Sequence, residues 1–148
     1  MAGELASFLQ TWCALRDVPV PAREADGRCF LVFDGLYEIA LSQLGRSIQL
    51  EADLAPLPQR RDLAEALLER LLKLQLARAP ESAAALTLSG EQRLVAVEQI
   101  ASDRLENRVF EERLGGFVNT VAMFMTLLSE EATPRPPAPM QAAQFFYP

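Results

Sequence analysis

Residues 47–58 read SIQLEADLAPLP, and this stretch decides the fold. Its apolar residues occupy every second position: Ile48, Leu50, Ala52 and Leu54. An alternation with a period of two predicts a β-strand with one dry face and one wet, acidic face. The pattern stops at Pro56 and Pro58, because proline lacks the N–H group that a strand needs for pairing. The stretch therefore predicts a sheet that is dry on one side and wet on the other.

Two more strands are predicted before this one. Residues 28–35 read RCFLVFDG, a short run rich in the aromatic and β-branched side chains that favour strands. Residues 36–44 read LYEIALSQL and alternate again. Asp34-Gly35 is a hairpin signal, and Gly45-Arg46 marks the next turn. Three strands joined by tight turns form an antiparallel meander.

A helix is predicted on each side of this meander. Residues 5–16 place apolar side chains at intervals of three and four, the spacing of one helical face. These side chains are Leu5, Phe8, Leu9, Trp12 and Leu15. Pro19 and Pro21 end this helix.

The second helix is expected in residues 60–79, RRDLAEALLERLLKLQLARA, which are rich in strong helix formers. Its leucines cover more than one narrow stripe: Leu63, Leu67, Leu68, Leu71, Leu72, Leu74 and Leu76. A helix packed on one sheet needs only one stripe. The wide apolar face predicts burial on two sides, against the parent sheet and against a second subunit.

Residues 84–100, AALTLSGEQRLVAVEQI, predict two further strands around Ser89-Gly90-Glu91. A final helix is expected from about residue 104 to 129, with Ser102 and Asp103 as its caps. Its buried side is expected at Val109, Phe117, Val121, Phe124, Met125 and Leu128.

Gly115-Gly116 lies inside this final helix and costs helix propensity, about 1 kcal/mol per glycine. We interpret the pair as a close-packing point or a kink. A break in the helix is the alternative.

The predicted order of elements is α-β-β-β-α-β-β-α, an α+β fold with a twisted, mostly antiparallel five-stranded sheet. We expect a single domain in residues 1–131 and a proline-rich flexible tail in residues 132–148. The tail ends in QFFYP, whose Phe145, Phe146 and Tyr147 either dock into a groove or are incidental. The segment RPPAP is also a short polyproline pattern of a kind that is common by chance.

Composition limits the classes of partner. The net charge is −6, and an acidic chain repels phosphate backbones, so we expect no nucleic-acid binding. The first residues lack the pattern of a signal peptide, and no segment is apolar and long enough for membrane insertion. Cys13 and Cys29 are expected to be reduced thiols of a cytoplasmic protein, with a disulfide bond as the alternative.

Groups that usually carry chemistry are scarce. The chain has no histidine, its two cysteines lack metal-ligand spacing, and no glycine-rich phosphate loop occurs. Glu51 and Asp53 share the wet face of one strand, but a catalytic pair would need a pocket and strongly perturbed pKa values. We therefore expect no enzymatic activity, no metal and no cofactor.

Apolar surface is the stronger signal. Phe8 and Trp12 lie one helical turn apart, and residues 30–33 are apolar on both faces of their strand. The first and last helices can cover one face of the sheet, which leaves the opposite face for a partner. For each single residue of this set, packing in the core is the competing interpretation.

In three places the sequence resembles the specificity chaperones of bacterial type III secretion, the CesT or Tir-chaperone family. The first is FLVFDGLYEIALSQLGRSIQLEADLAPLP, residues 30–58, and the second is the leucine-rich helix that follows it. The third is LSGEQRLVAVEQI, residues 88–100, leading into RLENRVFEERLGGFVNTVAMFMTLL, residues 104–128. The resemblance covers residues 5–130 and leaves the tail outside it.

The resemblance implies a cytoplasmic homodimer that holds the non-globular N-terminal segment of a secreted effector in extended form and hydrolyses no nucleotide itself. The secretion ATPase is a further implied partner. Affinity would come from a strand added to a sheet edge, and selectivity from apolar pockets. We assign effector binding to Phe8, Leu9, Trp12, Phe30, Val32 and Leu36. We assign the dimer interface to Leu67, Leu68, Leu71 and Leu72.

Three other functions remain open at this stage. The same scaffold would serve a regulator that sequesters an activator or another chaperone of the secretion system. An enzyme using the acidic residues is the second alternative. The third is a structural subunit whose leucine-rich helix meets a different chain.

Overall fold

The computed structural model describes residues 3–132 and has the predicted order of elements. The helices are α1 (Gly3–Leu15), α2 (Arg61–Arg78) and α3 (Asn107–Ala132). The strands are β1 (Cys29–Phe33), β2 (Tyr37–Leu44), β3 (Ser47–Pro56), β4 (Ala85–Leu88) and β5 (Arg93–Ala101). The predicted α+β class is confirmed. The predictions made for residues 133–148, including the flexible tail and its aromatic end, lie outside the described residues.

All strand pairs of the sheet are antiparallel, and the strand order is β1-β2-β3-β5-β4. The turn between β1 and β2 uses the predicted Asp34-Gly35 pair: both residues have positive φ, and the Leu36 N–H donates to the Phe33 carbonyl at 2.9 Å. A tight hairpin needs this left-handed conformation, which Asp and Gly adopt more easily than most residues. The predicted meander of β1, β2 and β3 is confirmed.

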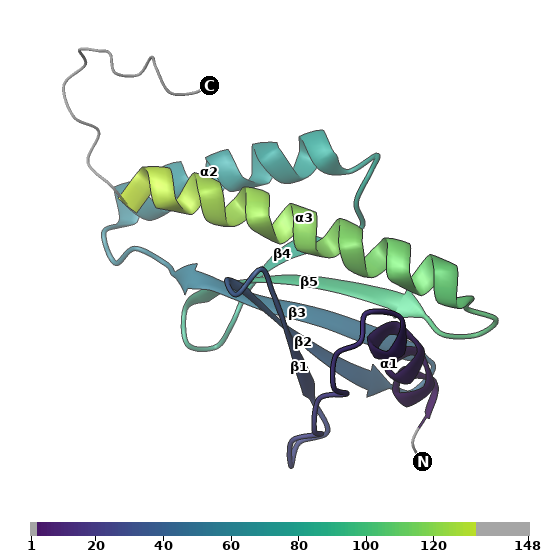
Figure 1. Ribbon diagram of the computed structural model, residues 1–148. Helices are drawn as coiled ribbons and strands as arrows, with labels where there is room; N and C mark the ends of the chain where they lie inside the picture. The colour runs from purple at the N-terminus through teal and green to yellow at the C-terminus, as the bar shows by residue number, and fades with distance from the viewer. Residues whose placement is uncertain (1–2, 133–148) are drawn as a thin grey trace, which may run out of the picture.

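The alternation in β3 appears in the structure as one buried face and one open face. Ile48, Leu50, Ala52 and Leu54 are buried in the single core cluster, whereas Gln49 and Asp53 lie on the other side. The same core takes side chains from all three helices, so the helices cover one face of the sheet. Figure 1 shows α2 and α3 side by side on that face, with α1 near one end of the sheet.

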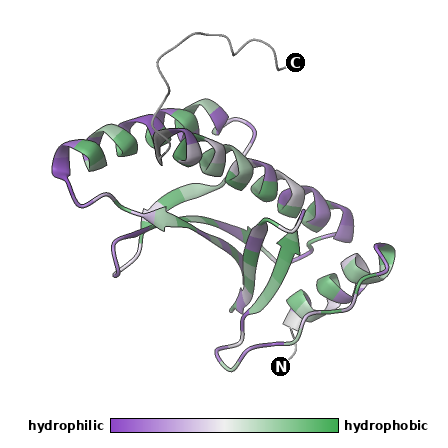
Figure 2. Cartoon of the chain, turned by 60° about the vertical axis from the view of Figure 1, so that its left-hand side comes forward, coloured by the Kyte–Doolittle hydropathy of each residue, from purple (hydrophilic) through white to green (hydrophobic). Residues whose placement is uncertain are grey.

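The long helix α3 lies against the middle of the sheet and contacts β3, β2 and β5. Its buried stripe is Phe110, Leu114, Phe117, Val121 and Phe124, spaced four, three, four and three residues apart. We predicted Phe117, Val121 and Phe124 correctly, but Val109 is only partly buried and Phe110 takes its place in the core. Figure 2 shows that apolar and polar residues alternate along the helices, as one-sided burial requires.

The start of α3 differs from the prediction. The helix begins at Asn107, so Ser102 and Asp103 lie in the preceding turn and do not cap it. Ser102 instead joins a buried polar network, because its hydroxyl donates to a Glu4 carboxylate oxygen at 2.9 Å. In the same network Gln43 accepts the Leu5 N–H at 2.9 Å. The network satisfies an N–H group in the first turn of α1 and holds this helix on the sheet.

A buried ion pair fixes α3 on β5. Arg113 Nε lies 2.6 Å from Glu98 Oε2, and the Glu98 side chain is only 2% exposed. Arg113 also donates to the Gln99 carbonyl at 3.2 Å. Glu98 occupies the helix-covered face of β5 between Ala96 and Ile100, both buried. A carboxylate in this position needs its cation, because an unpaired buried charge is strongly unfavourable.

Two of the three interpretations of Gly115-Gly116, the close-packing point and the helix break, are wrong. The helix runs through both residues without a break, and a Cβ atom added at either would meet nothing within 4 Å, so they are no close-packing point. Neither has a positive φ that would require glycine. Both residues reduce the helix propensity of α3.

The first prediction concerns the buried ion pair. Replacing Arg113 with Met should lower the free energy of unfolding by about 3–5 kcal/mol, because it leaves the Glu98 carboxylate buried without a cation. Urea denaturation followed by circular dichroism at one protein concentration measures the change. The double variant Arg113→Met with Glu98→Leu should recover most of the loss. A double variant that is less stable than Arg113→Met alone would contradict this account.

The second prediction concerns the helical glycines. Gly116→Ala should raise the free energy of unfolding by about 0.5–1 kcal/mol, because alanine has the higher helix propensity and its methyl group meets open space. Gly45→Ala is the matched control, since Gly45 has a φ of +59° and alanine is strained there. The control should be destabilised in the same urea experiment. Loss of stability in Gly116→Ala would show that this glycine has a packing role.

Candidate functional site

A furrow with partly apolar walls runs between α1 and α3, beside several of the predicted binding residues. We call it the α1–α3 furrow. One cavity of about 220 Å³ is lined by Phe8, Thr11, Trp12, Leu15, Asn107, Arg108, Phe110 and Glu111. A second of about 410 Å³ is lined by Trp12, Arg16, Val32, Phe33, Asp34, Glu111, Leu114, Gly115, Val118 and Asn119. Trp12 and Glu111 line both, so the cavities adjoin.

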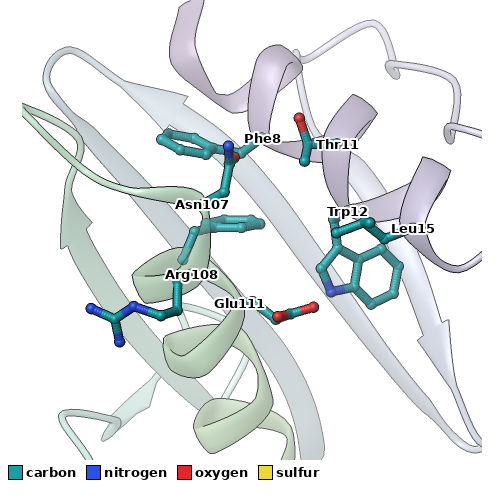
Figure 3. A pocket seen from close by; sticks show the side chains of 8 residues that line it. Phe8, Thr11, Trp12, Leu15, Asn107, Arg108 and Glu111 are labelled. Atoms are coloured by element: carbon teal, nitrogen blue, oxygen red, sulfur yellow. The ribbon is translucent and has the colours of Figure 1, made fainter.

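Aromatic contacts shape the walls of the furrow. Phe8 stacks on Phe110 with ring centroids 5.1 Å apart, which joins α1 to α3. Trp12 meets Phe33 edge to face at 5.6 Å, which joins α1 to β1. Both geometries are favourable for aromatic pairs. Figure 3 shows Trp12 and Leu15 on one helix, with Glu111 pointing toward Trp12 from the other.

The C-terminal end of α1 has a defined cause. Asp17 adopts a left-handed conformation with φ 54°, and the Val18 N–H donates to the Cys13 carbonyl at 3.0 Å. This arrangement satisfies a carbonyl that the helix leaves without a partner. It ends α1 at Leu15, where the helix borders the furrow.

The structure separates the six predicted binding residues into three groups. Phe8, Trp12 and Val32 line the α1–α3 furrow, and Val32 is 59% exposed. Leu9 is 2% exposed and lies in the core beneath α1, so it offers almost no surface. Phe30 and Leu36 lie outside both cavities. The first group is brought together at one site, and the others are not part of it.

Several furrow residues were missed by the analysis of the sequence. Leu15, Arg16, Glu111, Gly115 and Asn119 line the furrow but were not assigned to a binding site. A signal was present in α1: Leu5, Leu9 and Cys13 form a fully buried stripe, and a second stripe with Trp12 and Leu15 lies beside it. Two adjacent apolar stripes on one helix indicate more apolar surface than the core alone uses. The α3 residues gave no such signal, because polar residues on a helix usually face solvent.

The open face of the sheet carries ion pairs beside apolar side chains. The Arg28 guanidinium lies over the Phe30 ring, 5.2 Å from the ring centroid. The same guanidinium lies 3.6 Å from a carboxylate oxygen of Glu51. The backbone N–H and the guanidinium of Arg28 hydrogen bond to Asp26 and hold the pKa of that carboxyl below its usual value. Asp53 pairs with Arg93 at 2.8 Å. The predicted acidic, wet face is confirmed, and cross-strand ion pairs occupy part of it.

Only part of the predicted dimer interface is exposed. Leu67 and Leu71 belong to the core of the chain, 6% and 0% exposed, because this side of α2 faces α3 and the sheet. Leu68 is partly buried, whereas Leu72 and Leu76 are 54% and 75% exposed. Leu68, Leu72 and Leu76 form an apolar surface at intervals of four, which we call the α2 leucine face. The prediction that α2 carries a second apolar side is consistent with this arrangement.

The remaining chemical groups are few in the described residues. Cys13 and Cys29 are free and buried, and burial raises the pKa of the Cys13 thiol. No group of three acidic or cysteine side chains within residues 3–132 is arranged to hold a metal ion. No helix in this part of the chain is long and apolar enough to cross a membrane.

Comparison with protein families matches residues 17–125 to the Tir chaperone protein (CesT) family. The match covers most of the chain, so this protein belongs to that family of type III secretion chaperones. The family assigned from the pattern of strands and helices is thereby confirmed. A search of curated protein sequences finds no match.

Three solved structures share the fold. The chain is similar to one in the ExsC–ExsE complex, with 16% identity and a TM-score of 0.67, over 86% of this chain and 96% of that one. It is also similar to a chain in the HopA1–SchA chaperone–effector complex, with 14% identity and a TM-score of 0.65, over 82% of this chain and 93% of that one. The third similar chain is in the ExoU–SpcU complex of the type III secretion system of Pseudomonas aeruginosa. It has 17% identity and a TM-score of 0.60, over 79% of this chain and 94% of that one. At these identities the likeness establishes the fold alone.

Proposed function

We propose that this protein is a chaperone that binds the non-globular N-terminal segment of a type III secreted effector and keeps it soluble and competent for export. The single observation that carries the proposal is the α1–α3 furrow, an apolar site that the fold itself leaves uncovered. Membership of the CesT family and the similarity to chains from a chaperone–effector complex and from a heterodimeric complex of a type III secretion system support it.

The furrow lies beside an edge of the sheet. β1 is the first strand in the sheet order, and Val32 at its end lines the second cavity. An extended client segment paired with β1 would place its alternate side chains toward the furrow. At the opposite edge, Gln75 of α2 accepts the Leu86 N–H of β4 at 2.8 Å. That contact uses a backbone donor of β4, so we assign strand addition to β1.

The acidic charge of the chain suits such a role. A net charge of −6 limits aggregation of a protein that exposes apolar side chains. The same charge favours a client segment with basic residues. The secretion ATPase would be a further partner in such a role.

A regulatory role is the alternative that one comparison favours. The similarity to a chain of the ExsC–ExsE complex supports it. The same furrow would then hold a small regulatory protein. The length of the captured client distinguishes the two functions.

Client capture is the third prediction. Val32→Asp should lower capture of the client at least tenfold, because it places a charge where an apolar side chain would bind. Val20→Asp is the matched control: the same substitution at a valine 50% exposed and outside the furrow should leave capture unchanged. The measurement is co-purification with the N-terminal segment of the secreted protein encoded beside this gene. Equal capture by wild type and Val32→Asp would remove the furrow from the function.

We propose further that the α2 leucine face forms the centre of a homodimer. Leu68, Leu72 and Leu76 are flanked by Glu65, Glu69 and Lys73, an apolar strip with a charged rim. A separate apolar groove lies between α2 and α3, lined by Leu74, Ala122, Met123, Thr126, Leu127 and Glu130. Leu74 is on another side of α2 than the α2 leucine face, so this groove is not part of the proposed interface.

The fourth prediction tests this dimer. Light scattering at micromolar concentration should give twice the chain mass of 16.4 kDa for the wild type, and a single chain mass for Leu72→Glu. A glutamate at the centre of an apolar interface must be buried without a partner, which is strongly unfavourable. Leu36→Glu, at an exposed leucine of the β1–β2 turn, should leave the mass unchanged. A wild-type mass of one chain would contradict the dimer.

A further inference from the structure

One ion pair divides the α1–α3 furrow. Arg16 Nη2 lies 2.5 Å from Glu111 Oε2, which joins the end of α1 to α3. The Arg16 guanidinium also lies over the Trp12 ring, 4.3 Å from its centroid. Glu111 and Trp12 line both cavities, so this bridge stands where the two cavities meet. Without the bridge the two would form one continuous furrow.

The bridge is easily opened. Both side chains are about 40% exposed, at 39% and 41%. An ion pair as exposed as this one changes an equilibrium by about fivefold at most, because water screens it. The Arg16 side chain makes one further hydrogen bond, a long contact of 3.5 Å from Nη1 to the Trp12 carbonyl. A ligand that enters the furrow can therefore displace Arg16 from Glu111 at a small cost in free energy.

Displacing Arg16 leaves a carboxylate between two apolar cavities. Arg108 is the other cation among the lining residues, and it already pairs with Glu112 at 3.1 Å and with Glu106 at 3.5 Å. Asp34 adds a second carboxylate at the margin of the furrow. Glu111 and the Trp12 ring both attract a cation, and the two are adjacent. The opened furrow thus has a cation-binding centre flanked by apolar cavities.

We infer that the α1–α3 furrow selects extended client segments in which a basic side chain stands between two apolar ones, and that the basic group replaces Arg16 on Glu111 and Trp12. This inference rests on the proposed chaperone function and specifies the chemistry of its client. The lining residues of α3 extend from Asn107 to Asn119, a length of about 18 Å. About five or six residues of extended chain cover that distance. Residues at positions i, i+2 and i+4 of such a chain point to one side, as the arrangement requires.

The chain supplies its own reporter for a test. Trp12 is the single tryptophan of the protein, and it lies at the bridge, so its fluorescence reports occupation of the furrow directly. The probes are two synthetic nine-residue peptides with leucines at positions 3 and 7. One peptide has arginine at position 5 and the other has glutamine, and serine and glycine fill the other positions.

For the wild type we expect the arginine peptide to bind about fivefold more tightly than the glutamine peptide. Glu111→Gln should abolish this preference and leave the affinity for the glutamine peptide unchanged or higher. Arg16→Gln should bind the arginine peptide about fivefold more tightly than the wild type, because the competing guanidinium is gone. Glu65→Gln is the matched control: the same substitution in an exposed ion pair of α2 with Arg61, outside both cavities, should leave both affinities unchanged.

Three results would overturn the inference. The first is an equal affinity of the wild type for both peptides. The second is a preference for arginine that survives in Glu111→Gln, and the third is no response of Trp12 to either peptide at millimolar concentration. Any of these results together with client capture by the wild type overturns charge selection and leaves the chaperone function standing. The absence of client capture, with no response of Trp12, overturns both. Far-UV circular dichroism confirms that each variant is folded.

Discussion

The structure depends on the contact between α3 and the dry face of the sheet. Phe110, Phe117 and Phe124 are almost fully buried, as are Ile48 and Leu50 of β3. Burial of such large apolar side chains is the dominant favourable contribution to folding. Because α1 and α2 share this core, all three helices lie on one side of the sheet. The opposite face is left without a helix, and it has to be polar, paired or covered by a partner.

Polar contacts then set where the helices lie on that core. Apolar packing alone tolerates small shifts, whereas a buried charge or amide is satisfied in only one arrangement. The pair of Glu98 and Arg113 fixes α3 along β5, and the network of Gln43, Ser102 and Glu4 fixes the start of α1. These contacts hold α1 and α3 at the separation that leaves the furrow between them. The position of the furrow therefore depends in part on these polar contacts.

The surfaces that remain suit a holding function better than catalysis. The described residues offer apolar cavities and an exposed leucine strip, and most of their charged groups are paired with a neighbour of opposite sign. Such surfaces bind unfolded segments through shape and hydrophobicity, with charge deciding which segments are preferred. Phe8 shows how the two roles combine, because it is a core residue that packs on Phe110 and also lines the first cavity. A chaperone of the CesT family needs no more chemistry than this.

The sequence by itself determined the order of the elements, the α+β class and the two faces of β3, because these follow from local periodicity and turn residues. It also indicated that α2 carries more apolar surface than one sheet requires. Only the tertiary structure decided which leucines of α2 are used in the core: Leu67 and Leu71 are buried, and Leu72 and Leu76 are not. It likewise placed Leu9 in the core, put Val32 beside Trp12, and brought Glu111 to Arg16 across 95 residues of chain. The physical reason is that the spacing of apolar residues along the chain shows which residues share one face of a helix or strand. Which other element covers that face depends on packing between residues far apart in the sequence.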